Sequence, residues 1–424
     1  MIYLKKKLFT ALFVSLSASA FSQKIAVLHL TNTLPIERED ELVVLPRTFI
    51  ESKLGKIPQG SYLKFSIGKE TVAAQFDDLN GDGKWDEAAL LYSFKANEKA
   101  GLRVALTTQK TGAQEQRAHA RHKRKQADES FGNDLLKDSV PAGQQATDFA
   151  KQALPPFLTE GPAWENDKVG FRIYFDVRNG KDIWGKTTKA MVLDTVGVNP
   201  KLNYHEQSAW GMDVLKVGSS LGAGSLALKT NYHGKDTLIR LGGLNMGKII
   251  YEKLSDGPLR AIIRLHYPEW KALSGQAPID LTEEISIWGG QYFYESKVTA
   301  KHLPHGSQLI TGIVNLKSKS SKEVNQQDLT FVFTYDTQSE NKDNLGMAIL
   351  SQTKDKPAFS KTPNDLTDIK NTYTTAFKIV DGKPVKFRFV AGWEESLAEF
   401  KNLKSFESYL SRQARRFNVP IIVQ

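Results

Sequence analysis

The chain has 424 residues, of which 40% are hydrophobic and 25% are charged, and this composition is typical of a globular protein. The formal net charge of +10 suits either solubility alone or contact with acidic glycans, anionic membranes or nucleic acid, but no zinc-finger spacing, heptad repeat or RNA-binding aromatic motif supports nucleic acid. The absence of cysteine excludes disulfides, thiol catalysis and zinc–thiolate sites.

Residues 1–23 have the pattern of a secretory signal peptide. Lysines at 5–7 precede an apolar run over 8–18, and small residues at 18–20 form a cleavage site. The run is too short to span a membrane, and no cysteine is present to carry a lipid, so we expect no membrane anchor. The alternative is a buried N-terminal helix. The pattern predicts a mature protein that is periplasmic or secreted.

Residues 24–125 are predicted to form a small β-rich N-terminal domain. Strand-like segments lie at 24–30, 72–76, 87–94 and 102–107, and a short helix is expected over 46–54. A basic run over 117–125 ends this part and suits either a solvated face or contact with an acidic glycan. Residues 126–160, rich in Ser, Gly, Asp and Gln and containing three prolines, are predicted to be a linker.

Residues 161–424 are predicted to form a large antiparallel β-sandwich. Apolar and polar residues alternate with period two over 171–176, 259–266, 329–335 and 385–389, as expected for strands with one buried face. The one convincing late helix is expected over 406–417, with Ser405 as its N-cap. The predicted fold class is therefore mainly β with few helices.

A loop over 78–87 resembles the start of a calcium-binding loop. Its oxygen-bearing side chains stand at loop positions one, three, five and nine, namely Asp78, Asn80, Asp82 and Asp86. The glutamate expected at position twelve is replaced by Ala89. The loop therefore predicts either a structural calcium site or a polar hairpin turn. No other cofactor is expected.

Two further motifs are incomplete. Residues 218–222 match the letters G-x-S-x-G, but the segment that follows is a poor helix start, so we interpret it as a glycine-rich turn. His205 and Glu206 begin like H-E-x-x-H, but Ala209 stands where the second histidine should be, so this zinc motif is broken.

Polar and aromatic residues gather in four stretches that could carry chemistry. They are residues 203–213, residues 161–168 with the strand and turn that follow, the strand bearing Arg260 and Arg264, and residues 288–297. Aromatic faces stack on sugar rings, and arginine binds carboxylates or sulfates through two parallel hydrogen bonds. Each stretch alone suits ordinary packing, whereas several on one sheet face would form a glycan groove.

These stretches resemble a secreted domain-of-unknown-function family encoded in bacterial polysaccharide-utilisation loci. The resemblance is carried by residues 204–218, 161–172, 256–260, 288–292 and 392–394, and it extends from about residue 25 to the C-terminus. It implies a large β-sandwich of the galactose-mutarotase-like supersandwich kind. It also implies a relative that acts as an ulvan oligosaccharide dehydratase, removing water from a terminal uronic acid to leave an unsaturated sugar.

Such an elimination requires removal of the proton next to the uronate carboxylate while that carboxylate is neutralised. A base takes the proton and an acid protonates the departing hydroxyl. The chain offers His205 as the acid/base residue, with Tyr204 or Tyr174 as its partner. Arg172 and Arg260 are the candidate carboxylate clamp.

The predicted substrate is an anionic oligosaccharide. Trp164 and Trp210 are expected to stack on sugar rings, and the other candidate substrate-binding residues are Glu165, Glu206, Asp213, Lys216 and Arg264. Two alternatives stay open. The protein could bind glycans without catalysis, or it could be a glycoside hydrolase or sugar epimerase, with Glu165, Glu206 and Asp213 as candidate carboxylates.

Overall fold

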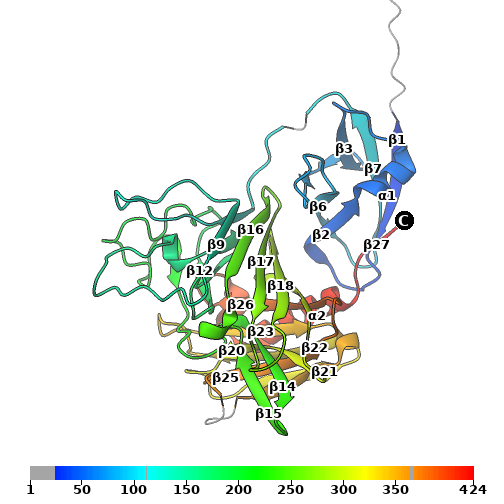
Figure 1. Ribbon diagram of the computed structural model, residues 1–424. Helices are drawn as coiled ribbons and strands as arrows, with labels where there is room; N and C mark the ends of the chain where they lie inside the picture. Colours follow the sequence, from blue (N-terminus) through cyan, green and yellow to red (C-terminus); the bar gives the residue numbers. More distant parts are fainter. Residues whose placement is uncertain (1–23, 111, 363–366) are drawn as a thin grey trace, which may run out of the picture.

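The computed structural model describes residues 24–110, 112–362 and 367–424, so the predicted signal peptide lies outside the described residues. The described chain is mainly β, with five antiparallel sheets and two α-helices (Figure 1). In this part of the chain, no helix is both long enough and apolar enough to cross a membrane.

The N-terminal unit contains two sheets around a hydrophobic core of its own. The five-stranded sheet has the order β27 (Ile422–Val423), β1 (Ile25–Thr31), β7 (Lys99–Thr107), β3 (Tyr62–Ile67) and β4 (Glu70–Val72). The three-stranded sheet has the order β2 (Arg38–Pro46), β6 (Glu87–Phe94) and β5 (Ala74–Asp77). The expected short helix is α1 (Arg47–Leu54), whose Ile50 and Leu54 are buried.

The larger unit is built on a nine-stranded sheet. Its order is β21 (Lys322–Gln326), β22 (Leu329–Asp336), β23 (Leu345–Ser351), β26 (Val385–Trp393), β19 (Phe293–Lys301), β18 (Ile279–Trp288), β17 (Arg260–Trp270), β16 (Ile249–Asp256) and β9 (Lys137–Val140).

Two five-stranded sheets complete the larger unit. One has the order β13 (Gly211–Asp213), β12 (Lys181–Lys186), β11 (Val169–Ile173), β10 (Ala163–Asn166) and β8 (Ala118–Arg121). The other has the order β15 (Lys235–Arg240), β14 (Ala223–Tyr232), β20 (Gln308–Val314), β25 (Thr372–Lys378) and β24 (Ala358–Lys361). Short 3-10 helices are η1 (Leu158–Glu160), η2 (Leu244–Met246), η3 (Thr353–Asp355) and η4 (Ala398–Lys401).

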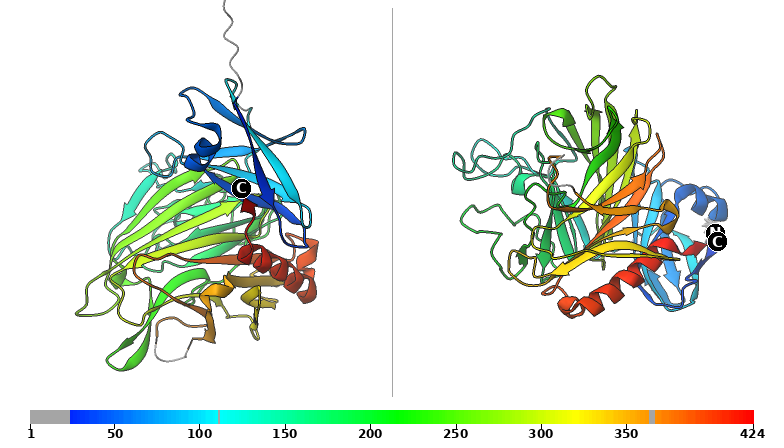
Figure 2. Two further views of the ribbon diagram at one scale, coloured as in Figure 1. Left: turned by 90° about the vertical axis from the view of Figure 1, so that its right-hand side faces the viewer. Right: turned by 90° about the horizontal axis from the view of Figure 1, so that it is seen from below.

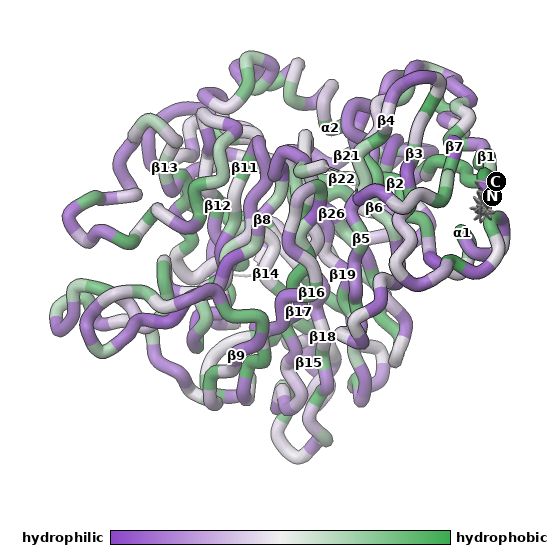
Figure 3. Tube along the Cα trace, turned by 90° about the horizontal axis from the view of Figure 1, so that it is seen from above, coloured by the Kyte–Doolittle hydropathy of each residue, from purple (hydrophilic) through white to green (hydrophobic). Residues whose placement is uncertain are grey.

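One hydrophobic core lies between these sheets. It contains Phe171 of β11, Leu226 of β14, Ile263 of β17 and Phe389 of β26. Along β17 the side chains alternate, because successive residues of a strand point to opposite faces, and Arg264 lies on the outer face. In Figure 3 the colour changes repeatedly between hydrophobic and hydrophilic along such strands. The predicted fold class, a mainly β antiparallel sandwich with a small N-terminal β-rich unit, is confirmed.

The larger unit begins earlier in the chain than the predicted domain boundary at residue 161. Strand β8 pairs with β10, and β9 pairs with β16, so residues assigned to the N-terminal domain and the linker belong to sheets of the larger unit. Strand β27 at the other end of the chain pairs with β1. The chain therefore enters the larger unit with β8 and returns to the N-terminal unit with β27.

Helix α2 (Leu403–Asn418) lies against β22 and β23 and also reaches the N-terminal unit (Figure 2). Phe406 packs beside Phe333 in the core, and Arg416 Nε donates to Glu41 of β2 at 2.8 Å. The helix begins earlier than predicted, because the Asn402 side chain accepts from the backbone N–H of Ser405. Asn402 is therefore the N-cap, and the prediction of Ser405 as the cap was wrong.

Candidate functional site

A buried network of charges lies on the sheet formed by β11, β12 and β13. Arg172 of β11 stands directly opposite Asp182 of β12 in the strand register. Its Nη2 lies 2.9 Å from Asp182 Oδ2 and 2.7 Å from Asp213 Oδ2, and all three side chains are only 1% exposed. Two carboxylates therefore share one guanidinium group in the interior.

The remaining donors of Arg172 are also occupied. Nη1 donates to the Thr159 carbonyl at 3.2 Å, to Glu160 Oε2 at 3.3 Å and to the Tyr204 hydroxyl at 3.0 Å, and Nη2 donates to the Tyr174 hydroxyl at 3.2 Å. A buried guanidinium with this many partners has no donor left for a substrate carboxylate. Arg172 organises the network, and its predicted role as a carboxylate clamp does not fit this geometry.

Tyr174 lies between two arginines. The Cζ atoms of Arg172 and Arg178 lie 4.8 Å and 3.9 Å from the centroid of its ring, and its hydroxyl donates to Asp182 Oδ2 at 2.8 Å. Burial raises the pKa of Tyr174, so the phenol stays protonated near neutral pH. Arg178 pairs with Asp176 and with Glu160 Oε1 at 2.6 Å, and its side chain is 37% exposed. Arg178 is thus the accessible cation of the network.

His205 and Tyr204 stand on the long connection between β12 and β13. Their rings lie 4.4 Å apart, and His205 Nδ1 is 3.4 Å from Asp213 Oδ2. The His205 side chain is 53% exposed. Its partial burial and the positive charge of Arg172 lower the pKa of the imidazole, which is therefore neutral near pH 7.

Asp213 has the opposite shift. Burial and the neighbouring charge of Asp182 raise its pKa well above the usual range, because two carboxylates around one arginine do not both ionise easily. Asp213 therefore keeps its proton, and the neutral His205 carries a proton of its own on one of its two ring nitrogens. When that proton is on Nδ1, the Nε2 atom of His205 has a free lone pair and can act as a base.

A cavity of about 340 Å³ opens beside this network. Glu160, Tyr204 and His205 line it on the network side. The other walls come from two loops and contribute Phe149, Ala153, Leu154, Pro155, Thr159, Gly197, Asn199, Pro200, Leu202 and Asn203. The cavity thus combines a few polar side chains with a mostly apolar lining, as ligand sites usually do.

The turn that presents Glu160 to the cavity is strained. Thr159 and Glu160 have φ values of 48° and 66°, in the left-handed region that non-glycine residues seldom adopt. Arg121 holds this turn, since it is fully buried and donates to the Leu158 carbonyl at 2.7 Å and to Thr159 Oγ1 at 2.9 Å. Burial lowers the pKa of Arg121 to about 10.

The connection that carries Tyr204 and His205 is anchored by ion pairs. Asp194, on this connection, lies 2.6 Å from Lys123 Nζ and 3.2 Å from His119 Nε2. The other ring nitrogen of His119 is 2.9 Å from Asp256 Oδ1. Burial alone would lower the pKa of His119, but the two carboxylates raise it to about 9, so the imidazole is charged at neutral pH.

Two predicted sugar-contacting residues are buried away from the cavity. Trp164 is 1% exposed and packs on Phe171 in the sandwich core. Glu165 is fully buried, pairs with Lys186, and accepts from the backbone N–H groups of residues 192 and 193 at 2.6 and 2.9 Å. The predicted substrate-binding roles of Trp164 and Glu165 are therefore corrected to structural ones. The indole fills the core, and the carboxylate ties the connection after β12 to the sheet.

Three other predicted residues lie near the network without joining it. Trp210 packs on Trp184 with ring centroids 5.8 Å apart, and Glu206 is exposed and accepts from Asn203 Nδ2 at 3.0 Å. Lys216 follows β13 and is exposed, and within the described residues no hydrogen bond or ion pair joins it to Arg172. None of these three side chains lines the cavity.

Arg260 and Arg264 lie on the outer face of the nine-stranded sheet. Arg260 pairs with Asp77 and, at 2.6 Å, with Glu87, both of the N-terminal unit, while Arg264 lies 2.8 Å from Glu284. Arg260 shares no recorded partner with Arg172 within the described chain. The predicted clamp of Arg172 with Arg260 is therefore not formed.

The loop over 78–86 turns its oxygens toward its own backbone. Asp78 accepts from the N–H groups of Gly81 at 2.7 Å and Gly83 at 2.8 Å, and Asp82 accepts from Lys84 N at 2.8 Å. Asp86 accepts from Asn80 Nδ2 at 3.1 Å. These bonds shape the loop with or without an ion, so calcium binding here stays a prediction.

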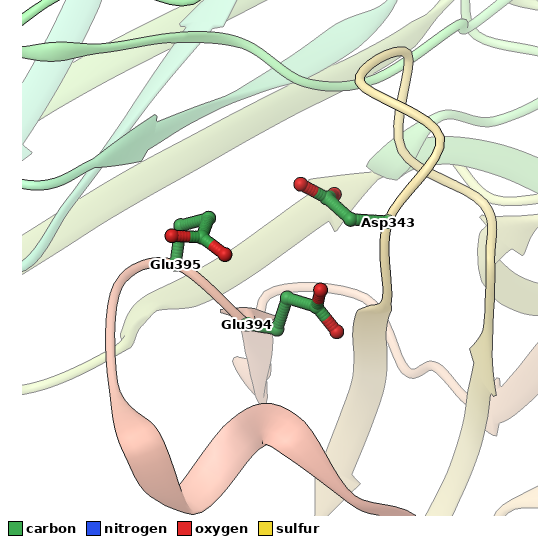
Figure 4. Close-up of side chains that lie close together, drawn as sticks. All are labelled: Asp343, Glu394 and Glu395. Atoms are coloured by element: carbon green, nitrogen blue, oxygen red, sulfur yellow. The ribbon is translucent and has the colours of Figure 1, made fainter.

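A separate acidic cluster contains Asp343, Glu394 and Glu395, which have carboxylate oxygens within 4.8 Å of one another (Figure 4). Asp343 already accepts from Trp393 Nε1 at 2.7 Å, and Glu394 accepts from Asn344 Nδ2 at 2.6 Å. Two of the three carboxylates therefore already accept hydrogen bonds from the protein, and the proximity of the three does not by itself define a metal site.

Sequence reasoning gave no role to Asp182, Arg178, Glu160 or Arg121. A partial signal for Asp182 was present, because the Asn-Gly pair at 179–180 predicts a turn between the strand that bears Arg172 and the segment that bears Asp182. That turn alone does not give the observed register, in which Arg172 stands opposite Asp182. No sequence signal marks Glu160, whose position depends on the strained turn.

Comparison with known proteins gives the family. Residues 30–423 match the family described as domain of unknown function DUF4861, and the chain belongs to this family. The predicted membership in a domain-of-unknown-function family is confirmed, while the polysaccharide-utilisation locus and the ulvan dehydratase stay predictions. A curated relative, "Uncharacterized protein P7" of Formosa agariphila, is 23% identical over 413 residues, which cover 92% of this chain and 91% of the relative.

Two solved structures are similar to the chain. An alpha-mannosidase from Enterococcus faecalis V583 has a TM-score of 0.46 at 12% identity, covering 95% of this chain and 46% of that one. A glycosyl hydrolase family 38 protein from Enterococcus faecalis has a TM-score of 0.46 at 13% identity, covering 95% of this chain and 48% of that one. The chain therefore spans less than half the length of either protein.

Proposed function

We propose that this protein is an exported carbohydrate-active enzyme that eliminates water, or a glycosidic leaving group, from uronic-acid-containing oligosaccharides to give an unsaturated uronate. The supporting observation is that the neighbouring His205 and Tyr204 side chains both line the cavity and that Tyr204 is bonded to the buried Arg172 network. The signal-peptide pattern supports action in the periplasm or outside the cell.

The two side chains suit opposite proton transfers. His205 is neutral near pH 7, so its Nε2 can take the proton next to the uronate carboxylate. Tyr204 keeps its phenolic proton, because burial raises its pKa, and can donate it to the departing hydroxyl. The pair thus supplies a base and an acid at one site.

The carboxylate of the substrate needs a cation as negative charge develops on it. Arg178 is the candidate that replaces Arg172, because its side chain is 37% exposed and it bonds Glu160, which lines the cavity. Its Nη1 has no acceptor recorded among the described residues, so two N–H donors remain for a substrate anion.

The hydrolase alternative is weaker on this geometry. Hydrolysis needs two accessible carboxyl groups across the sugar, whereas Glu165 and Asp213 are fully buried and Glu206 does not line the cavity. A non-catalytic glycan-binding protein is the second candidate, and it predicts that His205→Ala leaves binding intact while no product is formed by either protein.

The test is the ultraviolet absorbance of the conjugated product, with mass spectrometry for loss of water, on a panel of uronate oligosaccharides. We expect product from the native protein and a decrease of about 10²- to 10⁴-fold in His205→Asn. The matched control is His233→Asn, an exposed histidine with φ of 50°, a conformation that asparagine adopts readily. Elimination is refuted if no oligosaccharide gives either signal. Release of new reducing ends without unsaturation indicates hydrolysis.

A further inference from the structure

A row of charged side chains crosses the outer face of the nine-stranded sheet. The strand register places one charged residue of each of five neighbouring strands in this row. In order, they are Glu252 of β16, Arg264 of β17, Glu284 of β18, Lys297 of β19 and Lys386 of β26. Arg264 lies 3.0 Å from Glu252 and 2.8 Å from Glu284, and Lys297 lies 2.8 Å from Glu284. Acidic and basic side chains therefore alternate from β16 to β19, and a second ammonium group follows on β26.

This face is hollowed into a trough. A cavity of about 490 Å³ lies where the sheet meets the N-terminal unit, and a second of about 420 Å³ follows along the same strands. Arg264, Glu284 and Lys297 line both cavities, so the two are continuous. The N-terminal unit supplies the wall of the first, through Glu41, Leu42, Val44, Leu79 and Glu87.

Two buried N–H donors at the covered end of the trough have no acceptor among the described residues. They are Arg260 Nε and Trp288 Nε1, on residues that are 5% and 4% exposed and line the first cavity. The two residues stand directly opposite each other on β17 and β18. Because these two unpaired donors lie side by side in the wall of a cavity, oxygen acceptors of a ligand could pair with them there.

The trough is distinct from the His205 cavity. Phe171 of β11 and Ile263 of β17 both pack into the shared core, so Arg172 and Arg264, the neighbours of these residues along each strand, point to the two opposite outer faces of the sandwich. A ligand in the trough would not compete directly with one beside His205.

We propose that the trough is a second glycan-binding site, which holds a segment of an oligosaccharide whose hydroxyl, carboxylate or sulfate oxygens accept from Arg260, Arg264, Lys297 and Trp288. Planar guanidinium and carboxylate groups pair with adjacent sugar oxygens through two hydrogen bonds, and the row supplies both kinds of group. The trough would therefore bind an oligosaccharide of its own, separate from one in the His205 cavity.

The experiment is isothermal titration calorimetry in the His205→Asn background, which prevents turnover. The probe is an oligosaccharide fraction from a sulfated, uronate-containing polysaccharide, with carboxyl-reduced and desulfated forms of the same fraction. We expect two molecules bound per chain, and one in the double variant Arg264→Gln with Lys297→Gln. Both residues are at least 30% exposed, so the variant should fold, and its thermal unfolding checks this.

The matched control is Lys319→Gln, a side chain that is 90% exposed on a loop away from the trough, and it should keep both binding steps. Binding of one molecule that the double variant leaves unchanged overturns the proposal. Binding of one molecule that the double variant abolishes supports the trough and counts against the His205 cavity, so the two proposals fail separately. The reduced and desulfated forms show which oxygens the site recognises.

Discussion

The buried pair of Glu165 and Lys186 gives a sharp test, because the sequence and the structure assign it different roles. Both side chains have 0% exposure, and Lys186 has a further bond to the Asn166 carbonyl at 2.7 Å. Burial lowers the pKa of Lys186, so the ammonium depends on its partner. Removing one partner of a buried ion pair leaves an uncompensated charge and costs about 3–5 kcal/mol.

We therefore expect Glu165→Gln to lower the free energy of unfolding by about 3–5 kcal/mol. The double variant Glu165→Gln with Lys186→Met should recover much of this loss, because it removes the uncompensated charge while the amide oxygen still accepts from the N–H groups of residues 192 and 193. The measurement is urea unfolding followed by tryptophan fluorescence. The control, Glu206→Gln, is exposed and should change stability by less than about 0.5 kcal/mol. If Glu165→Gln behaves like that control, the carboxylate is not buried and its role in substrate binding returns.

Three further predictions concern charge and metal. Asp213→Asn should cost little stability, because the raised pKa of Asp213 keeps it protonated. Asp182→Asn should lower the free energy of unfolding by about 3–5 kcal/mol, because it removes a charged partner of the buried Arg172. Equal losses of the two variants in urea unfolding would contradict this prediction. His119 binds its proton more tightly in the folded protein than in the unfolded chain, where its pKa is about 6.5. The stability that this adds is fully present below about pH 6.5 and is lost as the pH rises through about 9. Unfolding at several pH values should show this decline in the native protein and not in His119→Gln. Calcium should raise the melting temperature of the native protein and not of Asp78→Ala, and calorimetry without binding heat would exclude the ion.

The sequence predicted the sheets and the central residues of the site, but not how those residues are used. Period-two alternation is a local signal, so the strands and the outward position of Arg264 could be inferred from it. His205 and Arg172 were selected by residue type, and the structure brings them together. The errors concern long-range burial. Nothing adjacent in the sequence shows that Trp164 enters the core, or that Glu165 faces Lys186 across 21 positions.

The clamp illustrates the same limit. Arg172 and Arg260 are alike in sequence, each on a strand near turn residues. Whether an arginine is free for a substrate depends on how many acceptors the fold places around it. For Arg172 these come from four separate segments, and for Arg260 from the N-terminal unit. Alternation assigns a face to a side chain, but only the pairing of sheets assigns its partners.

Strand β27 has a consequence for biosynthesis. Its residues, 422 and 423, form the edge strand beside β1 in the five-stranded sheet of the N-terminal unit. Arg38 donates to the Val419 carbonyl nearby. Strand β1 is synthesised long before β27, so the pairing of Leu30 with Val423 and of Thr31 with Ile422 forms late in folding. An open strand edge is a template for pairing with other chains. We therefore expect the edge of β1 at Leu30 and Thr31 to need protection from pairing with other chains until β27 docks on it.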